Sequence, residues 1–464
     1  MPRTLTIVGL FALAAVLRLH NAWAALPLSG FDGPFHAAYV GIIHYEGRLP
    51  SPYESWSTFH PPLYYALCAL LWDILPTSLD SRGVLFALRA INVAAGLGVG
   101  LAVWASARLL LPARPAVALY ATAVALFLPM VVAPSSLLGN EFLAMALSAL
   151  AVLLLLRTMA APRPLWYAAI LGAVLGLAVL SKISALVVLA AAVIALSLRG
   201  RRYGDLRPPA WKAPAVVGLA FLLVTAWYFA GNLARHGVPV VTEVENSVEL
   251  MAEQGFGSPR PLRAYVSLRP DILLNPADRS PRATGAVWPV TFATIWFDVH
   301  GTMIRVRSVW AKRFSRALFT CGAVITAIAS VGLAAVLAGR TRLAVPFGAL
   351  ALVILAALSV ASYVAFTYRV ATFSVLKGTY LAPGLVPFAL FAGIGFDALA
   401  ARGEWASRLL RVFLAVFVLA VVCISWSGWL APQKVNPAQL YLQAYSDAPS
   451  QRVFEYFVEG RRVE

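Results

Sequence analysis

Long apolar stretches are the feature that most constrains how this chain can fold. A helix needs about 20 apolar residues to cross the roughly 30 Å hydrocarbon layer of a bilayer. Such stretches predict an all-α polytopic membrane protein with about eleven transmembrane helices. They lie near residues 4–24, 85–111, 115–133, 141–160, 165–180, 184–199, 213–232, 316–338, 344–366, 380–401 and 407–429.

Composition supports this fold class and excludes others. Hydrophobic residues make up 61% of the 464 residues and charged residues only 12%, whereas soluble domains carry about 25% charge. The net charge of +17 comes from residues between the apolar stretches and not from one soluble face, so nucleic acid is not an expected partner. The three cysteines are widely spaced and indicate neither a metal site nor a redox pair.

The positions of Lys and Arg predict the orientation of the chain. Basic residues collect in alternate connections, and the positive-inside rule places such loops in the cytoplasm. We therefore expect a multi-pass protein of the plasma (inner) membrane with a cytoplasmic N-terminus. The predicted units are a catalytic membrane module at 1–232 that includes a first outer loop at 25–84, a small outer domain at 233–315, C-terminal membrane helices at 316–429 and an outer tail at 430–464.

The cytoplasmic loops are too short and basic to hold a nucleotide-binding domain. Gly96, Gly98 and Gly100 resemble a nucleotide motif, but no strand precedes them. They lie inside a predicted span, where small residues indicate close packing between helices. Any chemistry is therefore expected on the outer face, without a nucleotide cofactor.

The first outer loop carries the strongest candidates for chemistry. Pro34 is typical of a first helical turn, and Asp32 precedes it near the N-cap. Asp32 and His36 are four residues apart and would share one helix face. An acid and an imidazole there can deprotonate a hydroxyl or bind a divalent ion; the alternative is that Asp32 only caps the helix. The aromatic run at 62–67 is too short to span and predicts an interfacial helix.

Further polar residues are predicted at the same face. Glu141 begins an apolar stretch, where a carboxylate usually faces a polar cavity. The alternative is an interaction with the helix dipole, although the preceding Asn140 can cap the helix on its own. Lys182 lies in a tight turn, and Arg369 and Lys377 flank an outer loop. Such cations can neutralise a lipid-linked phosphate or extend toward ordinary anionic headgroups.

In their order along the chain, these residues resemble the GT-C superfamily of polyprenyl-phosphate-sugar-dependent glycosyltransferases. The nearest likeness is to the branch that contains the protein O-mannosyltransferases and the lipid A aminoarabinose transferases. The matching elements are the acid of the first outer loop, His60-Pro61-Pro62-Leu63, Asn140-Glu141, Ser181-Lys182 and the stretch from Lys377 to Pro383.

The resemblance implies a GT-C fold and an inverting transfer of a sugar to a hydroxyl group. The donor would be a polyprenyl-phosphate-linked sugar among the membrane lipids, and the acceptor a glycolipid, a polysaccharide or a protein. Asp32 and Glu141 would be catalytic, with Asp32 as the general base. Substrate contacts are implied for His36, Tyr39, His60, Asn140, Lys182, Arg369, Lys377 and Tyr380. A divalent metal ion would be held by Asp32, His36, His60 and Glu141.

Three positions depart from the pattern of that superfamily. Gly33 follows Asp32 where a second acid is common, Thr379 replaces a common Arg, and Gly231 precedes Asn232 where an Arg is often found. Altered or lost activity therefore stays open. Two alternatives to a glycosyltransferase also stay open: a lipid or solute transporter, and a non-catalytic subunit that keeps the GT-C fold.

Overall fold

The computed structural model describes residues 2–30, 32–161, 164–202, 211–241, 259–274, 285–297, 309–345, 347–426 and 448–457. Every regular element in these ranges is a helix. Eight of the described helices are long and apolar enough to cross a membrane, so the prediction of an all-α polytopic membrane protein is confirmed. They are α1 (Pro2–Ala24), α4 (Ser81–Leu110), α7 (Glu141–Ala160), α10 (Lys212–His236), α16 (Val309–Leu337), α17 (Gly348–Arg369), α18 (Leu385–Ala400) with the turn η4 (Gly378–Gly384) before it, and α19 (Glu404–Ser425).

A bent pair of helices occupies the predicted span at 115–133. α5 (Pro115–Phe127) and α6 (Pro129–Val132) meet at a bend of 63° and continue into the turn η1 (Pro134–Ser136). Pro129 explains the break, because proline lacks the N–H that continues the helix and holds the preceding Leu128 in an extended conformation.

Two shorter apolar helices occupy the stretch that was expected to hold two spans and a tight turn. They are α8 (Pro164–Ser181) and α9 (Leu186–Arg202), joined through the short turn η2 (Ile183–Ala185). Lys182 lies between α8 and η2 in an extended conformation. Helices thus lie at all eleven predicted positions, while the number that cross the membrane stays a prediction.

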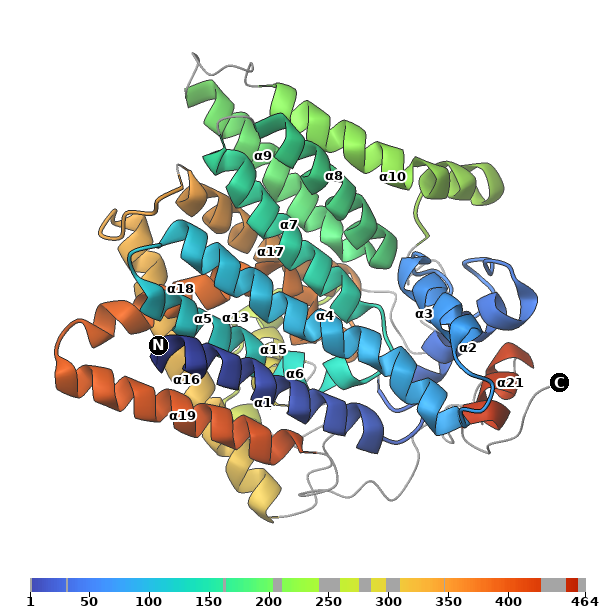
Figure 1. Ribbon diagram of the computed structural model, residues 1–464, viewed down its shortest axis with the longest axis horizontal. Coiled ribbons are helices and arrows are strands. Elements are labelled where there is room, and N and C mark those ends of the chain that lie inside the picture. Colours follow the sequence, from blue (N-terminus) through green and yellow to red (C-terminus); the bar gives the residue numbers. More distant parts are fainter. Residues whose placement is uncertain are drawn as a thin grey trace.

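Helix α4 runs through the middle of the bundle, between α1 and α7 (Figure 1). Its glycines permit close approach to neighbouring helices, as the sequence predicted. A Cβ at Gly100 would lie 2.4 Å from Cδ2 of Leu126, and one at Gly96 would lie 3.1 Å from Cβ of Ser135. These glycines therefore serve helix packing.

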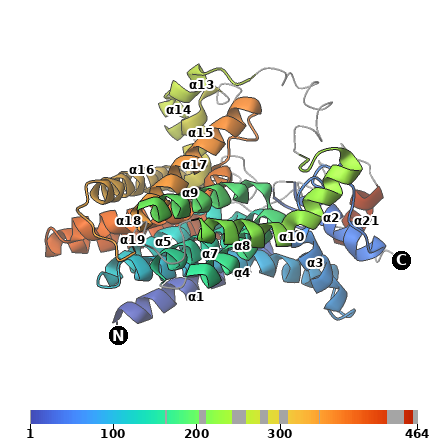
Figure 2. The same ribbon diagram turned by 90° about the horizontal axis from the view of Figure 1, so that it is seen from above.

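The first outer loop and the C-terminal helix together form a small helical unit at one end of the bundle. Its helices gather together in both views (Figures 1 and 2), and α3 falls in the stretch predicted as interfacial. Trp72 of α3 contacts Tyr456 and Phe457 of the C-terminal helix, with ring centroids 5.1 and 5.0 Å apart. The helices of this unit are α2 (Gly33–Glu46), α3 (Leu63–Ile74) and α21 (Ala448–Phe457).

Part of the predicted outer range 233–315 packs inside the bundle. Helix α15 (Val287–Trp296) is buried, and the Trp296 ring contacts Phe388 of α18 and Phe417 of α19. Two short helices, α13 (Arg263–Val266) and α14 (Pro270–Leu274), project from the bundle beyond α15 (Figure 2). Much of this range and most of the predicted tail 430–464 lie outside the described residues, so the division into units stays a prediction.

Candidate active site

Asp32 lies at the N-cap of α2, as predicted, but its side chain does not cap the helix. Its backbone is left-handed, with φ 53°, and among the described residues its carboxylate makes no capping hydrogen bond. The backbone N–H of His36 donates to the Asp32 carbonyl at 2.9 Å, so the two residues lie one helical turn apart. The predicted role of Asp32 as a simple cap therefore finds no support in this geometry.

A close contact in the backbone explains why no second acid follows Asp32. A Cβ at Gly33 would lie only 2.3 Å from the carbonyl oxygen of Leu28. Backbone cannot yield to a side chain at that distance, so position 33 accepts only glycine.

Glu141 forms an ion pair with Lys182 across two helix ends. Lys182 Nζ lies 2.7 Å from Glu141 Oε1, and the two side chains are 14% and 28% exposed. The expectation that Asn140 caps α7 is wrong: its side-chain Nδ2 donates instead to the carbonyl of Ser181 at 2.8 Å. Asn140 thereby joins the start of α7 to the end of α8 and brings Lys182 within reach of Glu141.

Gly139 brings the Glu141 and His36 side chains to one point. A Cβ at Gly139 would lie 2.9 Å from Glu141 Oε2 and 3.7 Å from His36 Nε2. The absence of a side chain at Gly139 therefore leaves room for the carboxylate and the imidazole to face the same space.

A stack of aromatic rings borders this space. The Tyr65 hydroxyl lies 2.8 Å from His36 Nδ1, and the Tyr39 ring stacks on Tyr65 at 3.9 Å between centroids. The Tyr39 hydroxyl donates to the His60 carbonyl at 3.3 Å, and the His60 and His36 rings lie 5.9 Å apart. Tyr65 was not predicted as a site residue, although its place beside the His60 element was a usable signal.

The segment at η4 contributes a cation and an aromatic ring, and the ring lies beside Lys182. Lys377 precedes η4 directly, and Lys182 Nζ lies 5.6 Å from the centre of the Tyr380 ring. Arg369 is exposed at the end of α17, and none of the contacts described above joins it to the cluster. The contacts described above link seven of the ten residues predicted for the site, and Asp32 lies one helical turn from one of them; the seven are His36, Tyr39, His60, Asn140, Glu141, Lys182 and Tyr380. The roles of all ten stay predictions.

The structure also places Thr379 and Gly231, the two remaining departures from the superfamily pattern. Thr379 lies within η4. A Cβ at Gly231 in α10 would lie 2.8 Å from Nη2 of Arg235, whose Nε donates to the Gly231 carbonyl at 3.1 Å. The Arg235 side chain thus covers the surface of Gly231.

Burial controls the charge of both imidazoles. It lowers the pKa of His36 below 6.5, while Glu141 and Asp32 raise that pKa and Lys182 and Lys377 lower it. Burial also lowers the pKa of His60 well below 6.5, with the same two lysines adding to the effect. Both rings are therefore neutral at pH 7. Glu141, Lys182 and Lys377 act on both rings, and Asp32 acts on His36.

Acidification is expected to destabilise the protein through these rings. Because their pKa values are lower in the folded than in the unfolded chain, the unfolded chain binds protons first as the pH falls below about 6.5. The free energy of unfolding therefore decreases through this range. Between pH 7.5 and 5.5 the Tm of the wild type should fall by more than that of His60→Gln, measured by thermal unfolding in detergent. An equal fall in both would contradict this assignment.

The predicted metal ligands do not form a complete site. In the part of the chain that the structure describes, no group of three or more His, Cys, Asp or Glu residues is arranged to hold a metal ion. Lys182 occupies Oε1 of Glu141, and Tyr65 occupies Nδ1 of His36. Glu141 Oε2 and His36 Nε2 still face the same space beside Gly139, so a divalent ion at these residues stays a prediction.

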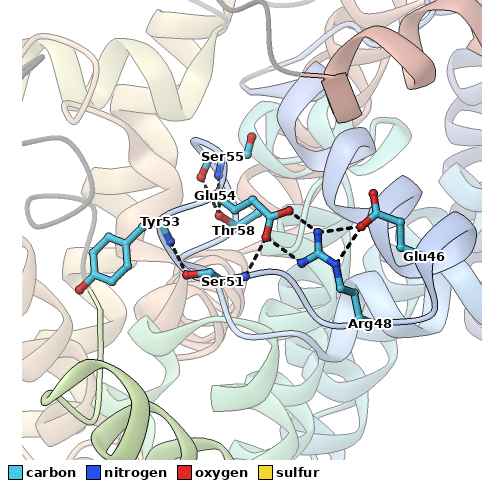
Figure 3. A network of polar contacts seen from close by, with 7 residues as sticks. All are labelled: Glu46, Arg48, Ser51, Tyr53, Glu54, Ser55 and Thr58. Carbon is cyan, nitrogen blue, oxygen red and sulfur yellow. Dashed lines mark hydrogen bonds and ion pairs between the residues drawn. The ribbon is translucent and has the colours of Figure 1, made fainter.

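The loop from α2 to His60 is held by an ionic network (Figure 3). The Arg48 guanidinium donates to Glu54 through Nη1 at 2.9 Å and Nη2 at 2.5 Å, and to Glu46 through Nε at 2.8 Å. The Tyr53 side chain points away from this network (Figure 3) and meets the His236 ring edge-on at 5.6 Å. The network thus orders the segment that precedes His60.

Comparisons with known proteins agree with this architecture. A model of the dolichyl-phosphate-mannose-protein mannosyltransferase family matches residues 59–229. No curated protein matches the sequence.

Several solved structures share the fold. The Archaeoglobus fulgidus oligosaccharyltransferase in its apo form has 13% identity and a TM-score of 0.55, over 99% of this chain and 60% of that one. ArnT from Cupriavidus metallidurans, bound to undecaprenyl phosphate, has 15% identity and a TM-score of 0.54, over 98% of this chain and 74% of that one. This chain therefore spans about three-fifths of the oligosaccharyltransferase. Another structure of that archaeal enzyme is described as a complex with Zn and sulfate.

Proposed function

We propose that this chain, a multi-pass membrane protein with the fold of the GT-C glycosyltransferases, transfers a sugar from a polyprenyl-phosphate donor to a hydroxyl acceptor. The resemblance to the GT-C superfamily that the sequence indicated is confirmed by the family model and by the fold. One observation carries the proposal: the ion pair of Glu141 and Lys182 meets the His36 imidazole at Gly139, one helical turn from Asp32, although these residues come from distant segments.

Asp32 is the general base in this proposal. Its carboxylate removes the proton from the acceptor hydroxyl while the oxygen attacks the anomeric carbon of the sugar. The bond from that carbon to the phosphate oxygen breaks on the opposite face, so the configuration inverts and the polyprenyl phosphate leaves. Glu141, His36 and His60 orient the substrates, and no step requires a metal ion.

Lys182 and Lys377 stabilise the departing phosphate. Positive charge that is fixed in place before the reaction stabilises the charge that develops in the transition state, often by several kcal/mol. Lys182 is held between Glu141 and the Tyr380 ring, which limits its motion. Arg369 is exposed, whereas both lysines act on the buried imidazoles, so we assign the phosphate to the two lysines.

An apolar cavity beside η4 suits the isoprenoid chain of the donor. Its volume is about 410 Å³, and its walls include Met130, Ile295 and Leu381. A Cβ at Gly378, next to Lys377, would lie 2.3 Å from Cγ1 of Ile295 and 3.0 Å from Sδ of Met130, so the start of η4 packs against the wall of the cavity. Since a cavity of about 150 Å³ holds one benzene ring, this one has room for roughly three isoprene units.

The distribution of basic residues supports a site on the outer face of the membrane. Asp32, His36 and His60 lie in the loop at 25–84, and the positive-inside rule assigns this loop to the outer side. We therefore propose an enzyme of the plasma (inner) membrane that acts on glycolipid, polysaccharide or protein acceptors at the outer face. Oligosaccharyltransferase structures contain dolichol-phosphate or an acceptor peptide, which supports this choice of substrates.

Mass spectrometry of copurifying lipids tests the proposal. The Asp32→Asn variant should retain the donor unreacted, so a polyprenyl phosphate that carries a sugar is expected in its lipid extract. The Lys182→Met variant is the control, because it should lose that lipid. If both extracts hold only bulk phospholipids, the transporter or the non-catalytic alternative is favoured.

A further inference from the structure

We propose that one face of helix α4, formed by Arg89, Asn92 and Gly96 and here named the α4 anchor face, sets the distance between the two acids of the site. These residues are three and four positions apart and therefore share one side of the helix. Arg89 binds the segment that leads to Asp32, and Asn92 binds the segment that leads to Glu141. The catalytic meaning of this arrangement rests on the proposed function.

Arg89 anchors the end of α1. The last carbonyl groups of a helix lack partners within that helix. Arg89 is 2% exposed, and its Nη1 donates to the carbonyls of Ala22 at 2.9 Å and Ala25 at 3.0 Å, while Nη2 donates to Leu26 at 2.6 Å. This fan of hydrogen bonds fixes the direction in which the chain leaves α1 toward Asp32.

Asn92 anchors the segment before Glu141. It is fully buried, and its Nδ2 lies 2.8 Å from the carbonyls of both Leu137 and Gly139. The Tyr64 hydroxyl accepts from the Gly139 N–H at 3.2 Å and from Asn92 Nδ2 at 3.2 Å. The Glu141 and His36 side chains both lie beside Gly139. Asn92 and Tyr64 therefore fix the backbone against which these two side chains pack.

Gly96 extends the anchor face to the break between α5 and α6. A Cβ there would lie 3.2 Å from Nε of Arg18. Arg18 in turn donates from Nη2 to the Leu126 carbonyl at 2.6 Å and from Nε to Ser135 Oγ at 3.1 Å. The Leu126 carbonyl is one of the helix-end acceptors that the break at Pro129 leaves without a helical partner. The glycine thus makes room for the arginine that holds the other end of the Glu141 segment.

The segments that lead to Asp32 and to Glu141 are therefore both hydrogen-bonded to one helix, α4. Helix α4 fixes the Asp32 side through Arg89 and the Glu141 side through Asn92, one helical turn away. A misplacement of about 1 Å in a catalytic group can cost about 100-fold in rate. The α4 anchor face thus consists of positioning residues, since none of them contacts the reacting groups.

Hydrogen exchange separates this role from a general contribution to stability. Asn92→Ala should raise amide exchange in residues 137–145 and leave peptides around Asp32 unchanged. Arg89→Lys should do the reverse, because lysine keeps the charge but loses the fan of donors. Ser106→Ala, a buried polar deletion on the same helix, is the control and should change neither. If exchange rises equally in both segments, or in neither, the proposal is overturned.

Kinetics give the second readout. Asn92→Ala is expected to lower kcat about 10-fold to 100-fold while the binding of undecaprenyl phosphate weakens by less than the 10-fold expected for Lys182→Met, because both lysines are kept and lie outside residues 137–145. Tyr64→Phe removes only a hydroxyl group and should show the same pattern with a smaller effect, which covers the case in which Asn92→Ala does not fold. Loss of kcat and binding together would contradict a positioning role. An inactive wild type would refute the proposed function. The exchange pattern would still decide whether the α4 anchor face positions the two segments.

Discussion

Replacing Asp32 with Asn is expected to lower kcat for sugar transfer by about 100-fold to 10,000-fold, the usual contribution of a general base. Asn has the same shape as Asp, and it also tolerates the left-handed backbone that this position adopts. Folding should therefore be unchanged. The measurement is the initial rate of transfer from the copurified donor, with Tm recorded beside it.

Asp80→Asn is the matched control for Asp32→Asn. Asp80 lies in the same outer loop and caps α4 by accepting from the Gly83 N–H at 2.8 Å, a role that Asn fills equally well. Its transfer rate and Tm should equal those of the wild type. Normal transfer by Asp32→Asn would remove Asp32 from the mechanism.

Replacing Lys182 with Met is expected to have the second large effect, on both stability and donor binding. The variant leaves the Glu141 carboxylate without its partner at a largely buried position. Such a loss costs on the order of 2 kcal/mol here, toward the low end for a buried pair because Glu141 is partly exposed. Binding of undecaprenyl phosphate should weaken at least 10-fold, as measured by titration in detergent.

A double variant separates the two effects of Lys182. Lys182→Met combined with Glu141→Gln removes both charges, so stability should return toward that of the wild type while the binding defect persists. Lys212→Met, at the start of α10, controls for the loss of a lysine in general. Wild-type binding by Lys182→Met would show that this lysine does not hold the phosphate.

Much of the fold could be predicted because a membrane leaves a backbone few choices. An apolar chain must satisfy its own N–H and C=O groups in lipid, so each long apolar stretch becomes a helix. The break inside the span at 115–133 was harder to predict, because Pro129 alone does not indicate how sharply the chain turns. The helix at 287–296 lies within the predicted outer range, and its ten residues are too few to span, so the sequence did not indicate that it packs inside the bundle.

The charged residues of the site were predictable for the same reason. A carboxylate or a lysine at the end of an apolar stretch is costly, and such residues usually serve a site. Sequence pattern gives the side of the membrane but not distances, and Arg369 therefore appeared equivalent to Lys377. The stretch from Lys377 to Pro383 matched the superfamily, but the hydrogen bond from the Gly378 N–H to Thr294 Oγ1 could not be predicted from it.

The contacts of the uncharged residues could not be predicted, because they are made with backbone that is distant in the sequence. Asn92 looks like any polar residue within a span until Leu137 and Gly139 are placed beside it. Gly33 raised the question of a missing acid, and only the Leu28 carbonyl answers it. Asn140 is a residue type that commonly caps helices, but its side chain forms a tertiary hydrogen bond to the Ser181 carbonyl instead.

We propose that Lys182 and Lys377 hold a polyprenyl phosphate beside Asp32. A cryo-electron microscopy structure of the wild-type protein with undecaprenyl phosphate in lipid nanodiscs tests it most directly. We predict phosphate density within hydrogen-bonding distance of Lys182 Nζ or Lys377 Nζ, with the isoprenoid chain passing η4 into the apolar cavity. Phosphate density out of reach of both lysines would contradict this account.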